Sequence, residues 1–183
     1  MKKLLFTLLV SVIALQLSAQ ENLLNKGDKV LNLGLGLGST GWGTGYSSSM
    51  IPLSASFEVG VVDGVLDVGS IGVGGFIGYA SYKYEWYTWK YKYTDLVIAA
   101  RGSLHYPLVE KLDTYTGLSL GYEAISFTES GDGTPTLGYS TVGSGMFLAW
   151  HAGARYYFTD NFAGMAEIGY GFTWLTLGVA LKF

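Results

Sequence analysis

Two histidines are the side chains of this sequence most suited to proton transfer or metal binding. His105 and His151 could serve as general bases or ligands if an acid or a hydroxyl lay beside them. In the period-two pattern, each histidine lies on the polar face of its segment, together with an arginine. A hydrogen bond to a neighbouring Glu or Ser is therefore the simpler role for both. No paired ligand motif surrounds either histidine, and the chain has no cysteine. The sequence therefore predicts no enzyme, no metal site and no cofactor.

Charged residues within the alternating segments share one face. In a strand, successive side chains point to opposite sides, and a basic residue facing the middle of a bilayer costs about 2–4 kcal/mol. We therefore expect three acids and three bases to form a network inside a barrel. An interior of eight strands is just wide enough to be filled by side chains, which favours a closed plug, although the same residues could form a gate. The predicted network is Glu58, Arg101, Glu123, Arg155, Glu167 and Lys182.

The segment 81–93 is the richest in aromatic residues. If residues whose numbers sum to 175 are paired, Tyr79 meets Leu96 and Ile77 meets Ile98, and the same register places six aromatic residues on one face of a hairpin. One interpretation is a stabilised hairpin that extends an aromatic girdle. The other is an exposed aromatic surface for a carbohydrate, a lipid head group or a protein. The six residues are Tyr82, Tyr84, Trp86, Trp89, Tyr91 and Tyr93.

The elements that must position these residues are strands. Twenty-seven glycines, 15% aromatic residues and a repeated period of two indicate an all-β chain of eight antiparallel strands. Connections at 62–65, 107–113 and 159–161 are short, whereas those at 39–51, 81–92 and 129–141 are longer, which is typical of an outer-membrane barrel. The connection at 171–173 departs from this pattern, because it is short although it must lie on the side of the long connections. We expect the strands near 29–38, 52–62, 65–80, 93–106, 114–127, 143–158, 161–170 and 174–183.

One face of these strands is apolar and would contact lipid. The alternation predicts a transmembrane β-barrel whose outward residues include Leu33, Ile98, Leu120, Leu148 and Val179. Aromatic residues that end the outward rows indicate an interfacial girdle. The predicted girdle at one end of the barrel is Tyr106, Tyr156, Phe158, Phe162 and Phe183.

The N-terminus has the pattern of a secretory signal. Lys2 and Lys3 precede an apolar run over 4–17 that closes on small residues, and this run is shorter than the roughly 20 residues of a spanning helix. We expect a cleaved signal peptide over residues 1–20 and the barrel over 21–183. The net charge of −3 becomes more negative after cleavage, which argues against a nucleic-acid partner.

The segment 153–171, together with the final residues Leu181, Lys182 and Phe183, resembles the outer-membrane-protein β-barrel domain family of Gram-negative bacteria. This family includes porin-family proteins and the small OmpA- and OmpX-like barrels. The resemblance implies an eight-stranded barrel in the cell outer membrane, inserted by an assembly machinery that reads the last strand. The expected partners are outer-membrane lipid, that machinery, and an extracellular ligand or protein.

Three functions remain open from the sequence. The first is a structural or interaction barrel with a filled lumen and extracellular hairpins. The second is a narrow porin or transporter for small solutes. The third, a soluble lipocalin-like barrel, would need an apolar interior, and the inward charges oppose it.

Overall fold

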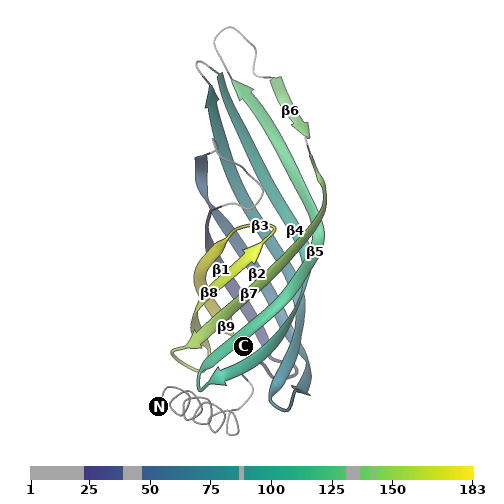
Figure 1. Ribbon diagram of the computed structural model, residues 1–183, viewed down its shortest axis with the longest axis vertical. Coiled ribbons are helices and arrows are strands. Elements are labelled where there is room, and N and C mark those ends of the chain that lie inside the picture. Colours follow the sequence, from purple (N-terminus) through teal and green to yellow (C-terminus); the bar gives the residue numbers. More distant parts are fainter. Residues whose placement is uncertain (1–22, 39–46, 87–88, 131–136, 142) are drawn as a thin grey trace, which may run out of the picture.

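Eight antiparallel strands form a closed ring in the computed structural model, which describes residues 23–38, 47–86, 89–130, 137–141 and 143–183. Each strand pairs with its neighbour in sequence, and the first strand pairs with the last (Figure 1). The predicted all-β fold with eight antiparallel strands is confirmed; a ninth short strand, β6, pairs with the same edge of β5 as β7 does, above the end of β7. The strands are β1 (Lys29–Leu37), β2 (Ser47–Val65), β3 (Gly69–Trp86), β4 (Trp89–Val109), β5 (Leu112–Ser130), β6 (Leu137–Thr141), β7 (Gly145–Tyr157), β8 (Phe162–Tyr170) and β9 (Leu175–Lys182).

The wall of the barrel has very unequal heights. Strands β2 to β5 contain between 18 and 21 residues, whereas β1, β8 and β9 contain 8 or 9. At about 3.3 Å per residue, the longer strands extend roughly 30 Å further along their own direction. Figure 1 shows the result: β3, β4 and β5 rise far above the short strands at the upper end, while the C-terminus lies at the lower end. We call β2–β5 the tall wall and the upper ends of β8, β9 and β1 the low rim.

The predicted register between β3 and β4 is confirmed. Tyr79 pairs with Leu96, and the ladder continues without a shift to Trp86 and Trp89. The stretch 81–92, expected as a long connection, is therefore mostly strand. Cross-strand aromatic pairs stabilise such a ladder, which explains why the chain does not turn back earlier.

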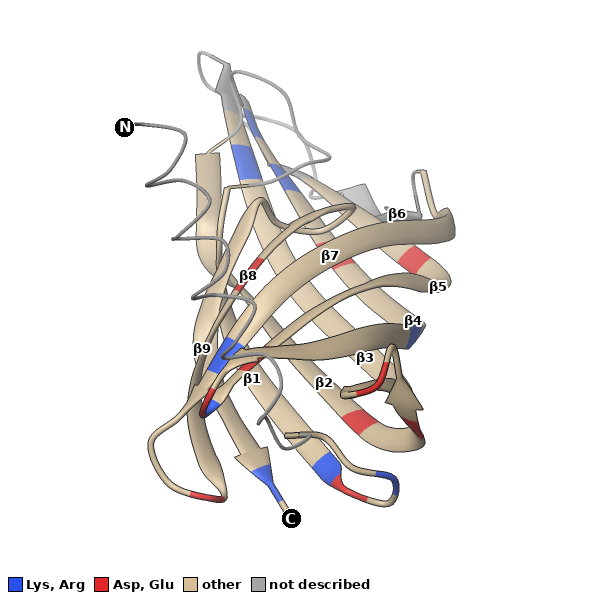
Figure 2. Cartoon of the chain, turned by 60° about the horizontal axis from the view of Figure 1, so that its bottom comes forward, with Lys and Arg blue, Asp and Glu red and all other residues tan. Residues whose placement is uncertain are grey.

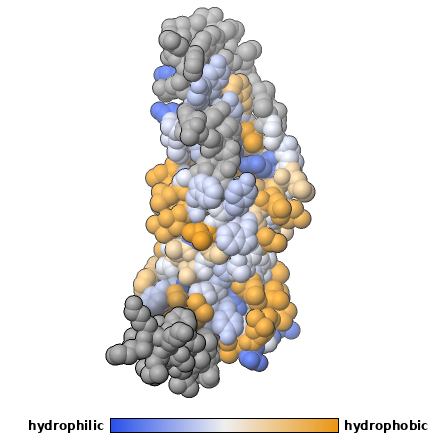
Figure 3. Space-filling model, in the orientation of Figure 1, coloured by the Kyte–Doolittle hydropathy of each residue, from blue (hydrophilic) through white to orange (hydrophobic). Residues whose placement is uncertain are grey.

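The outside of the ring is apolar. Leu33 is 44% exposed, Ile98 60%, Leu120 54% and Leu148 59%, while Val179 is partly buried between its neighbours. Figure 3 shows apolar residues over the middle and lower parts of the molecule and hydrophilic ones toward its upper end. The soluble-barrel alternative is wrong, because it requires these side chains inside. We call this outer surface the apolar belt.

The lower turn between β2 and β3 differs from its prediction. Residues 62–65 belong to β2, and the chain reverses at 66–68 instead. Irregular pairing around Gly60 and Asp63 lengthens β2, and Leu66 and Asp67 take the left-handed conformation with φ of 52° and 75°. That conformation costs non-glycine residues of order 1–3 kcal/mol.

Residues 23–28 close the lower mouth of the barrel. Leu24 is 1% exposed and packs with Val30, Tyr157, Ala163 and Ala180. The Gly27 amide donates to the Gly60 carbonyl at 2.9 Å, and a Cβ at Gly60 would overlap the Asn25 carbonyl. Residues 23–28 thus plug the lower end of the lumen, and their packing against β2 requires a glycine at position 60.

The expected signal peptide itself, residues 1–20, lies outside the described residues. Within the described ranges, no helix is long and apolar enough to cross a membrane. The expected long connections 39–51 and 129–141 are described only in part.

Candidate functional site

Arg155 is the centre of a buried polar network in the lower lumen. Its side chain is fully buried and donates from Nη2 to Glu58 Oε2 at 2.7 Å and from Nη1 to Asp113 Oδ2 at 3.1 Å. Its Nε donates to Asn32 Oδ1 at 3.0 Å, and Asn32 in turn donates to Ser56. The residues come from β1, β2, β5 and β7, so the guanidinium ties strands on opposite sides of the ring together.

His105 lies between the two acids that bind Arg155. Its Nδ1 is 3.0 Å from Asp113 Oδ1, and its Nε2 is 3.0 Å from Glu58 Oε1. Ionised carboxylates only accept hydrogen bonds, so the ring satisfies both contacts by carrying both N–H groups as an imidazolium. Arg155 and His105 then balance Glu58 and Asp113, and the cluster is electrically neutral.

Tyr115 joins this cluster to a second ion pair. Arg101 binds Glu167 through both guanidinium ends, with Nη1 3.3 Å from Oε1, and Tyr115 donates to Glu167 Oε2 at 3.1 Å. The Tyr115 ring lies 4.5 Å from the Arg155 guanidinium carbon and 5.7 Å from that of Arg101. A cation on a ring face is stabilised electrostatically, so one tyrosine couples the two pairs.

Apolar side chains lie above and below these polar groups. The Leu24 cluster seals the lower end, and at the upper end Val97 is fully buried in a cluster with three phenylalanines. Phe76 stacks on Phe147 at 6.4 Å between centroids and meets Phe172 edge-on at 5.7 Å. The charges are therefore enclosed between two apolar layers.

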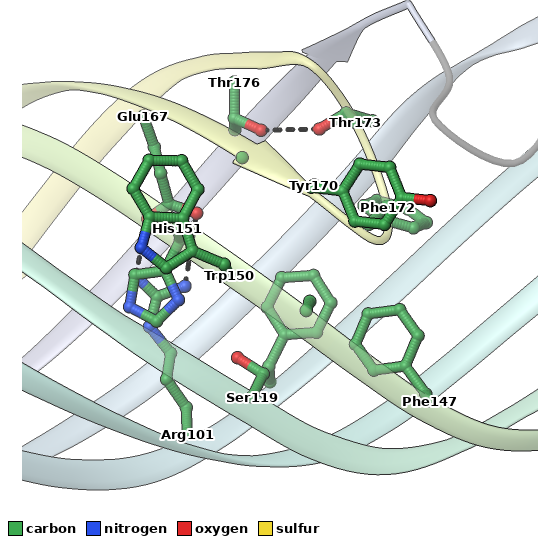
Figure 4. A pocket seen from close by; sticks show the side chains of 13 residues that line it. Arg101, Ser119, Phe147, Trp150, His151, Glu167, Tyr170, Phe172, Thr173 and Thr176 are labelled. Atoms are coloured by element: carbon green, nitrogen blue, oxygen red, sulfur yellow. Dashed lines mark hydrogen bonds and ion pairs between the residues drawn. The ribbon is translucent and has the colours of Figure 1, made fainter.

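A small cavity of about 30 Å³ lies where the upper apolar layer meets the Arg101–Glu167 pair (Figure 4). Arg101 Nε and His151 Nδ1 are buried and have no hydrogen-bond partner among the described residues. His151 Nε2 is 3.1 Å from Ser103 Oγ. The cavity is large enough for a water molecule.

Four of the six predicted network residues come together in the lumen: Glu58, Arg101, Arg155 and Glu167. Glu123 lies further up β5, opposite Val97, and forms no ion pair with any described residue. Lys182 lies at the lower end, 3.8 Å from Asp28, so its expected place in the network is wrong. The two-residue alternation predicted which face of its strand each residue occupies, but not its height along the barrel.

Three members of the network were not predicted from the sequence: Asp113, Tyr115 and Asn32. Asp113 was expected in a turn, because the strand was expected to start at 114. The sequence did contain a signal for two of them: Asp113 and Tyr115 are separated from the inward Glu123 by even numbers of residues, so they lie on the same face of the strand. Across the described ranges, no group of three His, Cys, Asp or Glu side chains could hold a metal.

The aromatic face of the hairpin turns toward the lumen side of the tall wall. Tyr82 is 4% exposed, so its expected exposure is wrong, and it follows the buried Ala80 with a spacing of two. Tyr91 and Tyr93 pack on Phe127 of β5 with centroids 5.8 and 5.1 Å apart. Tyr84 contacts Tyr91 at 6.2 Å, whereas the side chains of Trp86 and Trp89 lie outside what the structure describes.

The girdle residues lie at the lower end on the outside. Four are exposed, and Tyr106 is partly buried. Phe158 lies 5.7 Å from Tyr156 and 6.0 Å from Phe162 between ring centroids. Phe183 contacts Phe57 of β2 at 6.2 Å. Such aromatic clusters suit a membrane–water interface.

The comparisons with known proteins concern the fold. No family model matches the chain, and no curated protein matches it significantly. Among solved structures, Ail of Yersinia pestis in complex with the heparin analogue sucrose octasulfate is similar with a TM-score of 0.56 and 14% identity, covering 86% of this chain and 99% of that one. The chain has the fold of a small outer-membrane β-barrel. A second structure of Ail matches this barrel with a TM-score of 0.50, 16% identity and coverage of 86% and 99%.

Proposed function

We propose that this barrel resides in the outer membrane with a side-chain-filled lumen and acts as a structural or interaction protein through its upper hairpins. The single observation that carries the proposal is the combination of an enclosed, charge-balanced lumen with a tall wall that rises far beyond the short strands. With the tall wall pointing away from the cell, the upper end of the barrel is extracellular and the lower turns are periplasmic. The apolar belt supports membrane insertion.

The filled lumen argues against a narrow porin. An ion crossing it would have to separate Arg155 from Glu58 and Asp113 and then pass the apolar layers around Leu24 and Val97. Breaking a buried pair costs about 3–5 kcal/mol, and an apolar constriction excludes water. Among the described residues, no feature of the lumen favours transport over closure.

In a planar bilayer, the purified barrel should give no discrete conductance steps. The Arg101→Ala/Glu167→Ala variant should also be silent, because the apolar layers above and below remain. Leu148→Ala, on the apolar belt, is the matched control for handling and insertion. Channels in the parent whose size changes in the Arg101→Ala/Glu167→Ala variant would make the barrel a porin instead.

The tall wall is the part that we propose meets external partners. Aromatic side chains supply much of the energy at binding sites, and Tyr84, Tyr91 and Tyr93 form such a surface with Phe127. The similar Ail structure contains a sulfated sugar, which makes sucrose octasulfate a reasonable first probe.

Replacing Tyr84, Tyr91 and Tyr93 by Ser should weaken binding of sucrose octasulfate, titrated calorimetrically in detergent, by about tenfold or more. The matched control replaces three exposed tyrosines of the outer surface, Tyr122, Tyr156 and Tyr170. Heat-modifiable migration should persist in the hairpin variant, because the spanning region is intact. If that variant does not insert, the hairpin is a girdle; if it binds as the parent does, its aromatic face is not the site.

We propose that residues 1–20 are a signal peptide and that 21–183 form the mature barrel. The assembly machinery would recognise β9, which ends beside the exposed Phe183. In the lower lumen, the described acids and bases are paired with one another, which supports a role without catalysis.

A further inference from the structure

The charges at the upper end of the barrel are divided between the two faces of the tall wall. Lys83, Lys90 and Lys92 are exposed on the outward face of the β3–β4 hairpin. The residues that connect the upper strand ends contain no Lys or Arg. Figure 2 shows basic positions high on the tall wall, apart from those at the lower turns. Above Arg101, the described part of the inner face therefore carries no basic residue.

Two acids lie on this inner face. Because Val97 of β4 pairs with Glu123 of β5, Asp95 and Glu123 are diagonal neighbours, with Cα atoms roughly 7–8 Å apart. Asp95 is buried, whereas Glu123 is partly exposed. Arg101, further down β4, is already bound to Glu167. Two carboxylates without a base beside them give the upper part of the inner face a negative potential.

Aromatic rings continue the inner face upward from these acids. Phe127 lies four residues beyond Glu123 on β5, about 13 Å along the strand. Its ring contacts those of Tyr93 and Tyr91, with centroids 5.1 and 5.8 Å away, and Tyr91 contacts Tyr84 at 6.2 Å. All four rings are partly exposed. Ring faces attract cations, and the planar guanidinium of arginine also stacks on them.

We propose that the inner face of the tall wall binds an arginine-bearing, cationic polypeptide segment, with a guanidinium stacked near Tyr93 and Phe127 and attracted by Glu123. The inference rests on the function proposed above, because it names the charge of the partner that the same aromatic residues would meet. Sucrose octasulfate could stack its sugar rings there, but its sulfates would approach two carboxylates. On the outward face, a cation would instead meet three lysines. Charge complementarity therefore favours a cationic partner on the inner face.

The test titrates the whole barrel calorimetrically, in a zwitterionic detergent, with acetylated tetra-arginine amide. Acetylated tetraglutamate amide is the probe of opposite charge. The parent should bind tetra-arginine at least about tenfold more tightly than tetraglutamate or sucrose octasulfate, and added salt should weaken this binding. Glu123→Gln should weaken tetra-arginine binding about threefold to fivefold, as expected for one partly exposed ion pair. The matched control, Glu110→Gln, changes an exposed acid of the lower end and should bind as the parent does.

A second pair of variants tests the rings. Tyr91→Ser/Tyr93→Ser should weaken tetra-arginine binding about fivefold to tenfold, whereas Tyr122→Ser/Tyr170→Ser, on the outer surface, should not. Glu123→Gln preserves the size of the side chain, so it decides the outcome even if the tyrosine variant does not insert.

Three results would overturn the proposal. The first is tetra-arginine binding that Glu123→Gln leaves unchanged. The second is an equal loss in Glu110→Gln, which would mean that only the net charge of the barrel matters. The third is tighter binding of sucrose octasulfate than of tetra-arginine by the parent. Failure of the function proposed above would appear separately, as channels or as sucrose octasulfate binding that is unchanged when Tyr84, Tyr91 and Tyr93 are replaced.

Discussion

Arg155→Leu should produce one of the two largest losses of stability in this barrel, about 3–5 kcal/mol, because it strands two ionised carboxylates without their shared partner. Glu58 and Asp113 are at most 1% exposed, and Arg155 is their bridge. His105 alone cannot balance both charges. The free energy of unfolding, measured from urea titrations of the barrel in detergent, should fall by this amount, and the heat-modifiable fraction should fall with it.

A matched control and a rescue separate charge from packing. Lys29→Leu removes an exposed cation of β1 and should change stability little. The double variant Glu58→Leu/Arg155→Leu keeps His105 paired with Asp113 at 3.0 Å and should recover at least half of the loss. If the double variant is less stable than Arg155→Leu alone, packing and hydrogen bonding contribute more to the stability of the cluster than charge balance does.

Gly74→Ala should lower the free energy of unfolding by about 3 kcal/mol, because the added methyl group meets main chain that cannot move aside. Gly74 faces Glu58 of β2 and Arg101 of β4, and its Cβ would overlap the Phe57 carbonyl and lie 2.8 Å from the Glu58 Cα. Both neighbours are held in a closed ring. Urea titration of the refolded variant measures the loss.

The adjacent glycine provides the control. A Cβ at Gly75 would lie no closer than 3.8 Å to any neighbouring heavy atom, and the residue is exposed on the apolar belt. Gly75→Ala should therefore stay within about 0.5 kcal/mol of the parent. Similar losses at both positions would mean that glycine is needed for flexibility of β3 rather than for close approach.

Most of the fold could be predicted from the alternation of apolar and polar residues along each strand. Leu33 and Leu148 lie outside and Arg101 and Glu58 inside because one-residue alternation admits only two faces, and only one of them tolerates charge. The register through Tyr79 and Leu96 followed from the same pattern. These are local rules, and they require no knowledge of the rest of the ring.

The height of an inward residue along the barrel could not be predicted from this alternation. Lys182 and Glu123 have the parity of the network but lie below and above it, because strand tilt and stagger decide which inward residues meet. Asp113 joins Arg155 although 42 residues separate them in sequence. The extra height of the tall wall depends on pairing beyond the membrane, where no change of hydrophobicity marks the end of a strand.

The seam between β1 and β9 has a kinetic consequence. Lys29 and Phe183 exchange two main-chain hydrogen bonds, of 3.1 and 2.9 Å, beside the β1–β9 ladder, so the ring closes only when β9 reaches β1. The β1–β9 ladder and the Asn32–Arg155 bond depend on that late meeting, whereas β1 also pairs with β2, its neighbour in sequence. Contacts between such distant residues slow folding, because loop entropy is lost before they form. The ring therefore stays open until β9 has joined it, and a truncation that removes β9 would leave two open strand edges instead of a slightly smaller barrel.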